Sequence, residues 1–111
     1  MRVLVVDDEQ PARERLKQLL QDEAGYDCVG EAGNGSDAVR MAAEMRPDIV
    51  LLDIRMPGMD GIETAHHMNS LEHPPAIVFT TAYDEYAIDA FDARAIGYVL
   101  KPVRRARLSG A

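Results

Sequence analysis

The sequence predicts an α/β fold in which a five-stranded parallel sheet is covered by helices on both faces. Five short apolar runs alternate with segments of helical periodicity along the 111 residues, which is the pattern of parallel strands joined by helical crossovers. The central run, residues 49–52, is too short for an ordinary helix and rich in branched residues, as a strand buried on both faces is. No linker, internal repeat or low-complexity segment divides the chain. One domain over residues 1–111 is expected.

The first three strands are expected at residues 2–6, 26–32 and 49–52. A helix follows the first strand from Gln10-Pro11, because proline is favoured in the first helical turn. Asp27 and Glu31 make the second strand more polar and indicate an edge position. The helix after it can be capped by Asn34 or Ser36 and ends before Pro47.

The second half of the chain repeats this alternation. A third helix is expected over residues 62–71, a fourth strand over 76–79, a fourth helix around Ala87 to Phe91, and a fifth strand over 97–100. Five strands with this spacing resemble a flavodoxin-like sheet of order 2-1-3-4-5 rather than two linked halves.

Composition limits the possible functions. The formal net charge of −7 argues against direct binding to a nucleic-acid backbone. No apolar run is long enough to span a membrane and the start does not resemble a signal peptide, so a cytoplasmic protein without membrane contact is expected. The single cysteine, Cys28, cannot form an internal disulfide and is expected to be a reduced thiol in or near the core.

Residues capable of metal or phosphate chemistry follow four of the five apolar runs. They are Asp7-Asp8, Asp53, Thr80-Thr81 and Lys101. Parallel strands bring their carboxyl ends to one edge of the sheet, so these side chains are expected to meet in one pocket. Three carboxylates in such a pocket would repel one another unless a cation lay between them, and Mg²⁺ suits this set of oxygen ligands. Asp53 could then act as a nucleophile that forms an aspartyl phosphate, with Lys101 and Thr81 contacting the phosphoryl oxygens.

Each of these residues has a simpler interpretation when taken alone. Asp7 or Asp8 could cap the helix that follows, Asp53 could be an ordinary loop carboxylate, Lys101 could be a solvated surface side chain, and Thr81 could close a local turn. Their common position after apolar runs favours a shared site. His66 and His67 are adjacent on the predicted helix and point apart, so they are not expected to bind a metal ion together.

Four stretches, residues 3–9, 48–61, 80–82 and 97–102, together resemble the receiver domain of two-component response regulators in order and spacing. The CheY-like fold of that family agrees with the fold expected from the pattern of strands and helices. Residues 80–87, Thr-Thr-Ala-Tyr-Asp-Glu-Tyr-Ala, further resemble receivers of the AlgR/LytR type, whose output is usually a carboxyl-terminal LytTR DNA-binding domain.

The resemblance implies a role for each matching residue. Asp53 matches the phosphoacceptor, Asp8 and Asp7 match the acidic metal-binding pair, and Arg55 supplies a further Mg²⁺ ligand through its backbone carbonyl. Lys101 matches the lysine that pairs with the acceptor or its phosphoryl group. The remaining matches belong to the conformational switch: Thr81, Ala82 and Tyr98.

As a member of that family the chain would take a phosphoryl group from a sensor histidine kinase and lose it by slow autodephosphorylation, without turning over an external substrate. It would contact DNA only through an output domain outside this sequence and would regulate transcription. The resemblance also implies a homodimer through the fourth helix, fifth strand and last helix. Because the last helix is cut short at Ala111, the chain is interpreted as the amino-terminal fragment of a longer regulator, in which truncation could alter or swap the dimer.

Two alternatives belong to other functional classes. A magnesium-dependent phosphatase with an aspartyl nucleophile would carry a second acidic residue two positions after Asp53, where this chain has Arg55. An interaction module that ignores phosphate would not need the full set of acidic residues, threonine and lysine. Unchanged association after Asp53→Asn would favour this second alternative.

Overall fold

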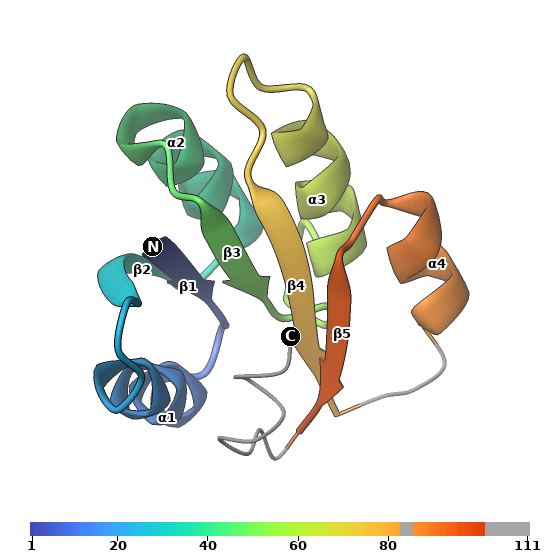
Figure 1. Ribbon diagram of the computed structural model, residues 1–111. Helices are drawn as coiled ribbons and strands as arrows, with labels where there is room; N and C mark the ends of the chain where they lie inside the picture. The colour runs from blue at the N-terminus through green and yellow to red at the C-terminus, as the bar shows by residue number, and fades with distance from the viewer. Residues whose placement is uncertain (83–85, 102–111) are drawn as a thin grey trace.

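Strands and helices alternate throughout the computed structural model, which describes residues 1–82 and 86–101. Figure 1 shows the strands side by side in the middle of the molecule, with α1 near β1 and the edge strand β2, and α4 beside β5 at the opposite edge. The elements are, in order, β1 (Arg2–Val6), α1 (Gln10–Gln21), β2 (Asp27–Ala32), α2 (Gly35–Met45), β3 (Ile49–Leu52), α3 (Gly61–Asn69), β4 (Ala76–Thr81), α4 (Ala87–Asp92) and β5 (Gly97–Leu100).

All neighbouring strands pair in parallel, and the sheet order is β2-β1-β3-β4-β5. This order confirms the predicted topology, including the edge position of β2. The sheet separates two apolar clusters. Ala38, Ala65 and Ala90 bring α2, α3 and α4 to one face, whereas Leu16 and Leu20 bring α1 to the other. The central strand β3 is therefore covered on both faces, as its continuous apolar run predicted.

Local sequence signals explain where several helices begin and end. Pro11 lies in the first turn of α1, where its missing N–H group leaves no helical hydrogen bond unmade. Asn34 caps α2 by accepting a hydrogen bond from the Asp37 amide at 2.8 Å, and Asp60 caps α3 by accepting one from the Glu63 amide at 2.9 Å. Of the two predicted caps, Asn34 and Ser36, it is Asn34 that caps α2.

Three predicted strands, residues 2–6, 49–52 and 97–100, have the observed ends. β4 is longer than predicted, because Thr80 and Thr81 continue its pairing with Val99 and Leu100 of β5. The expectation for Cys28 was wrong: its side chain is exposed. The residue lies in the first half of the edge strand β2, where burial increases only toward Ala32.

The last helix expected after Lys101 lies outside the described residues. None of the helices within residues 1–82 and 86–101 combines the length and the apolar character needed to span a membrane.

Candidate functional site at the carboxyl edge of the sheet

Backbone hydrogen bonds continue the parallel pairing for one residue beyond three of the strands. The amide of Asp7 donates to the Ala32 carbonyl at 3.1 Å, that of Asp53 to the Val6 carbonyl at 2.9 Å, and that of Lys101 to the Thr81 carbonyl at 2.7 Å. Asp7, Asp53 and Lys101 are therefore held by the sheet itself rather than by flexible loops. This explains why residues 94 positions apart, Asp7 and Lys101, meet at one edge.

Three carboxylates gather at this edge. Asp7, Asp8 and Asp53 each place one carboxylate oxygen within 4.8 Å of those of the other two. Asp7 is fully buried and Asp53 is only 5% exposed, whereas Asp8 is exposed to solvent. A set of carboxylate oxygens at this spacing offers the ligands that a hard divalent cation prefers. The predicted convergence of these residues is confirmed.

Lys101 is the cation of the cluster. Its Nζ atom donates to Oδ2 of Asp7 at 2.7 Å and lies 3.6 Å from Oδ1 of Asp53. Burial opposes the charged form, but the hydrogen bond to Asp7 and the charges of Asp53 and Asp7 leave the pKa of Lys101 above its ordinary value. The shorter contact goes to Asp7, although the sequence resemblance had associated this lysine with Asp53.

Asp53 carries an unfavourable charge. Its pKa is raised from 3.8 to about 6, first by burial and then by the negative charge of Asp7, while the charge of Lys101 acts in the opposite direction. At neutral pH the Asp53 carboxylate is therefore ionised although its burial and the charge of Asp7 disfavour the negative form. Added positive charge at this edge would stabilise the ionised form.

Asp7 is fixed by two further contacts, of which sequence reasoning missed the one from Arg13. Its Oδ1 atom accepts a hydrogen bond from the Glu9 amide at 3.0 Å, and its main-chain carbonyl accepts one from Nη1 of Arg13 at 2.8 Å. Arg13 also donates through Nε to Glu31 at 2.8 Å. The basic residue one turn into the helix after the acidic pair was the only sequence signal for this contact. The hydrogen bond from Glu9 resembles the capping interaction considered for Asp7.

The remaining predicted residues surround this cluster. Thr81 is buried at the end of β4, and Ala82 follows it as an exposed residue. Tyr98 is half-buried on β5 and packs against the apolar cluster that contains α3 and α4. The Arg55 side chain is exposed and lines, with Asp8 and Tyr86, an open cleft of about 410 Å³ beside the carboxylates.

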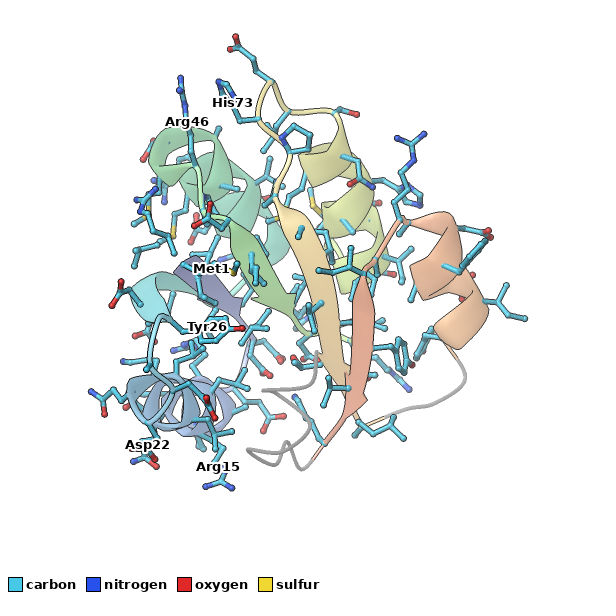
Figure 2. All side chains as sticks on the ribbon, viewed as in Figure 1. Met1, Arg15, Asp22, Tyr26, Arg46 and His73 are labelled. Atoms are coloured by element: carbon cyan, nitrogen blue, oxygen red, sulfur yellow. The ribbon has the colours of Figure 1, made fainter. Side chains whose placement is uncertain are left out.

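Other polar residues lie apart from the site. His66 and His67 are exposed on α3, as expected for solvated helix residues. Figure 2 shows Arg46 and His73 at the end of the sheet where β3 and β4 begin, opposite the edge that carries the carboxylates. Of the described histidine, cysteine and acidic residues, Asp7, Asp8 and Asp53 form a group that could hold a metal ion.

Comparison with known structures places this fold among signal-receiver proteins. The chain superposes with a TM-score of 0.91 on a protein in the crystal structure of the CheX-CheY-BeF3-Mg+2 complex from Borrelia burgdorferi, at 28% identity, covering 99% of this chain and 84% of the other. The response regulator receiver domain model matches residues 3–111.

Curated relatives narrow this class. The chain is 49% identical to the positive alginate biosynthesis regulatory protein of Pseudomonas aeruginosa over its whole length, and 45% identical to the transcriptional regulatory protein BtsR of Escherichia coli over 97% of its length. It spans 45% of the length of each of these relatives. The chain belongs to the response regulator receiver domain family, and its relatives are of the LytTR type, as the AlgR/LytR resemblance predicted.

Proposed function

We propose that this chain is a phosphoacceptor switch in which Asp53 takes a phosphoryl group from a sensor histidine kinase. The observation that carries the proposal is the cluster of Asp7, Asp8 and Asp53 within 4.8 Å, with Lys101 beside two of the three carboxylates. A buried carboxylate next to a fixed cation is an arrangement suited to phosphoryl transfer, which depends mainly on positioning and charge stabilisation.

In the proposed reaction an oxygen of Asp53 attacks the phosphorus of a phosphohistidine. The new O–P bond forms as the N–P bond breaks, and the imidazole leaves with the electron pair and takes up a proton. Lys101 lies 3.6 Å from Asp53 and can pair with an oxygen of the transferred group. Ala82 is small and exposed, so that it leaves the acceptor accessible, and Thr81 offers a hydroxyl group from the adjacent strand end.

Mg²⁺ fits the donor set, since carboxylate oxygens are its preferred protein ligands. Asp7, Asp8, Asp53 and the backbone carbonyl of Arg55 would hold the ion, which when bound supplies positive charge to balance the transferred group. The similar structure from Borrelia burgdorferi is named as a complex with Mg²⁺ and BeF3, and this supports the assignment. The pKa of Asp53 is raised first by burial and then by the charge of Asp7, so positive charge added at the site would favour its ionised form.

The output of the switch is proposed to be dimerisation and transcription control. Thr81 and Tyr98 lie on adjacent strands that connect the site to α4, where Ile88 and Phe91 are 78% and 82% exposed. Such large exposed apolar side chains suit a phosphorylation-dependent contact with a second copy. The chain would be the receiver of a longer cytoplasmic regulator with a LytTR-type DNA-binding domain, a proposal supported by the length and names of its relatives.

The aspartyl phosphate then hydrolyses slowly, so the protein serves as a signalling acceptor rather than as an enzyme that turns over an external substrate. This proposal predicts that incubation with Mg²⁺ and acetyl phosphate adds the mass of one phosphoryl group. Borohydride reduction of the acyl phosphate should then locate the label at residue 53.

The Asp53→Asn variant should gain no phosphoryl group, whereas Asp92→Asn, which changes an exposed carboxylate on α4, should be labelled like the parent chain. Labelling of the folded Asp53→Asn variant to the same extent would contradict the proposal. So would the absence of labelling in a parent chain shown by circular dichroism to be folded.

A further inference from the structure

Arg13 connects the acidic edge of the sheet to the neighbouring strand β2. Its guanidinium donates through Nε to Oε1 of Glu31 and through Nη1 to the main-chain carbonyl of Asp7, both at 2.8 Å. The side chain is only 18% exposed. Two donors of one rigid, planar group thus fix two acceptors on different parts of the chain.

The orientation of the Asp7 carbonyl affects the position of the backbone at Asp8. The carbonyl of Asp7 and the amide of Asp8 belong to one planar peptide unit, so a bond that orients the carbonyl also orients the path of the chain into Asp8. The Asp7 amide is held separately by Ala32 at 3.1 Å. Arg13 therefore holds the main-chain carbonyl of Asp7, whereas the sheet holds its main-chain amide.

The anchor of Arg13 is itself well fixed. Glu31 accepts a hydrogen bond from Lys17 at 2.6 Å as well as the one from Arg13, and these two contacts hold the pKa of Glu31 below its ordinary value. Glu31 precedes Ala32, whose carbonyl accepts the Asp7 amide. Hydrogen bonds thus link Asp7 to Arg13 and Arg13 to Glu31 on β2, and the next residue of β2, Ala32, is bonded back to Asp7.

We propose that Arg13 is a positioning residue that orients the Asp7–Asp8 peptide unit, so that both carboxylates face Asp53, and thereby sets the affinity of the site for a divalent cation. Arg13 donates to the backbone and to Glu31, so it acts on the ion through the orientation of other ligands. The inference rests on the proposed function, because it assigns a metal-binding role to Asp7, Asp8 and Asp53.

The competing interpretation is that Arg13 only fastens α1 to β2. Lys17 provides the matched control, because it also lies on α1 and pairs with Glu31. Within the described residues its hydrogen bonds go to Glu14 and Glu31 and not to Asp7. Arg13→Met and Lys17→Met each remove one cation from Glu31, but only the former removes the donor to Asp7.

The experiment is a titration of the 111-residue chain with Mn²⁺, followed by electron paramagnetic resonance of the free ion, because Mn²⁺ shares the oxygen-ligand preference of Mg²⁺. Loss of a residue that orients metal ligands typically lowers affinity by about 10- to 100-fold. We expect a loss in this range for Arg13→Met and less than about twofold for Lys17→Met on the same scale. Urea unfolding without metal measures the stability of each variant separately.

Arg13→Lys supplies a second test that does not depend on the folding of Arg13→Met. Lysine keeps the charge but has a single nitrogen in place of the planar fork, so its affinity for Mn²⁺ should lie between those of the parent chain and Arg13→Met. Equal Mn²⁺ affinity for Arg13→Lys and the parent chain would overturn the proposal. Equal losses for Arg13→Met and Lys17→Met would also overturn it, since both would then act by fastening α1 to β2.

Phosphorylation by acetyl phosphate distinguishes failure of this inference from failure of the proposed function. If the inference is right, saturating Mn²⁺ should restore most of the labelling rate of Arg13→Met, because the acceptor itself is unchanged. Normal Mn²⁺ binding and labelling in Arg13→Met would overturn the role of Arg13 and leave the phosphoacceptor function standing. A parent chain that neither binds Mn²⁺ nor is labelled would overturn both.

Discussion

Replacing Asp53 with asparagine should stabilise the folded chain at neutral pH while abolishing the proposed acceptor chemistry. The Asp53 side chain is almost fully buried, and its pKa rises from 3.8 to about 6. A difference of about 2 pH units at about 1.4 kcal/mol each corresponds to a cost of about 3 kcal/mol for keeping this carboxylate ionised in the folded state. Asparagine has nearly the same shape and no charge, so it removes this cost.

The pH dependence identifies the cause of the gain. Between pH 3.8 and about 6 the folded chain retains a proton on Asp53 that the unfolded chain releases, so the free energy of unfolding falls as pH rises through this window. Above this pH window the folded chain bears the full free-energy cost of keeping Asp53 ionised. The advantage of Asp53→Asn should therefore be largest near pH 8 and disappear near pH 4, while contributions from other titrating groups cancel in the comparison.

The assay is urea unfolding followed by circular dichroism at pH 4, 6 and 8 in the presence of a chelator. With a typical urea dependence of about 1–3 kcal/mol per molar, a gain of about 3 kcal/mol moves the midpoint by at least about 1 M. A saturating divalent cation should narrow the gap, because it binds and stabilises the folded parent chain. Equal stability of the two proteins at pH 8, or a gain that is the same at pH 4, would refute the electrostatic reasoning.

Two further substitutions test the packing around the site. Thr80→Val should raise the free energy of unfolding by about 1 kcal/mol, measured from the urea midpoint, because the Thr80 hydroxyl is buried and has no hydrogen-bond partner among the described residues. Gly61→Ala should lower it by at least about 2 kcal/mol and slow labelling by acetyl phosphate, since an added Cβ would lie 2.1 Å from the Asp53 carbonyl oxygen. Unchanged stability in either variant would contradict the corresponding contact.

The sheet could be predicted because its strands are apolar and its connections are short. A parallel strand buried on both faces needs a continuous apolar run, and residues 3–6 and 49–52 supply such runs. The strands predicted over residues 2–6, 49–52 and 97–100 have the observed ends. The end of β4 could not be predicted in this way. Thr80 and Thr81 are polar, and they belong to the strand because they pair with Val99 and Leu100, which is a property of the neighbouring strand.

The contacts within the site divide in the same way. Some follow from the local sequence pattern, and others depend on how the strands and helices lie relative to one another. The sequence predicted that Asp7, Asp53 and Lys101 would meet, because each follows an apolar run. It did not predict that Lys101 would lie closer to Asp7 than to Asp53, since that choice depends on the relative positions of β5, β1 and β3. The contact from Arg13 to the Asp7 carbonyl likewise depends on how α1 packs beside β2.

The same electrostatic arrangement accounts for both the cost of the site and its proposed use. The sheet fixes the backbone at Asp7 and Asp53 by hydrogen bonds to neighbouring strands, so their carboxylates cannot move far apart to relieve repulsion. Lys101 offsets part of that repulsion, yet burial and the charge of Asp7 keep the pKa of Asp53 raised. A site held in this state gains stability from any positive charge that enters it, which favours cation binding. Removing the repulsion by Asp53→Asn should therefore give a more stable protein with weaker cation binding, so stability and cation affinity should change in opposite directions.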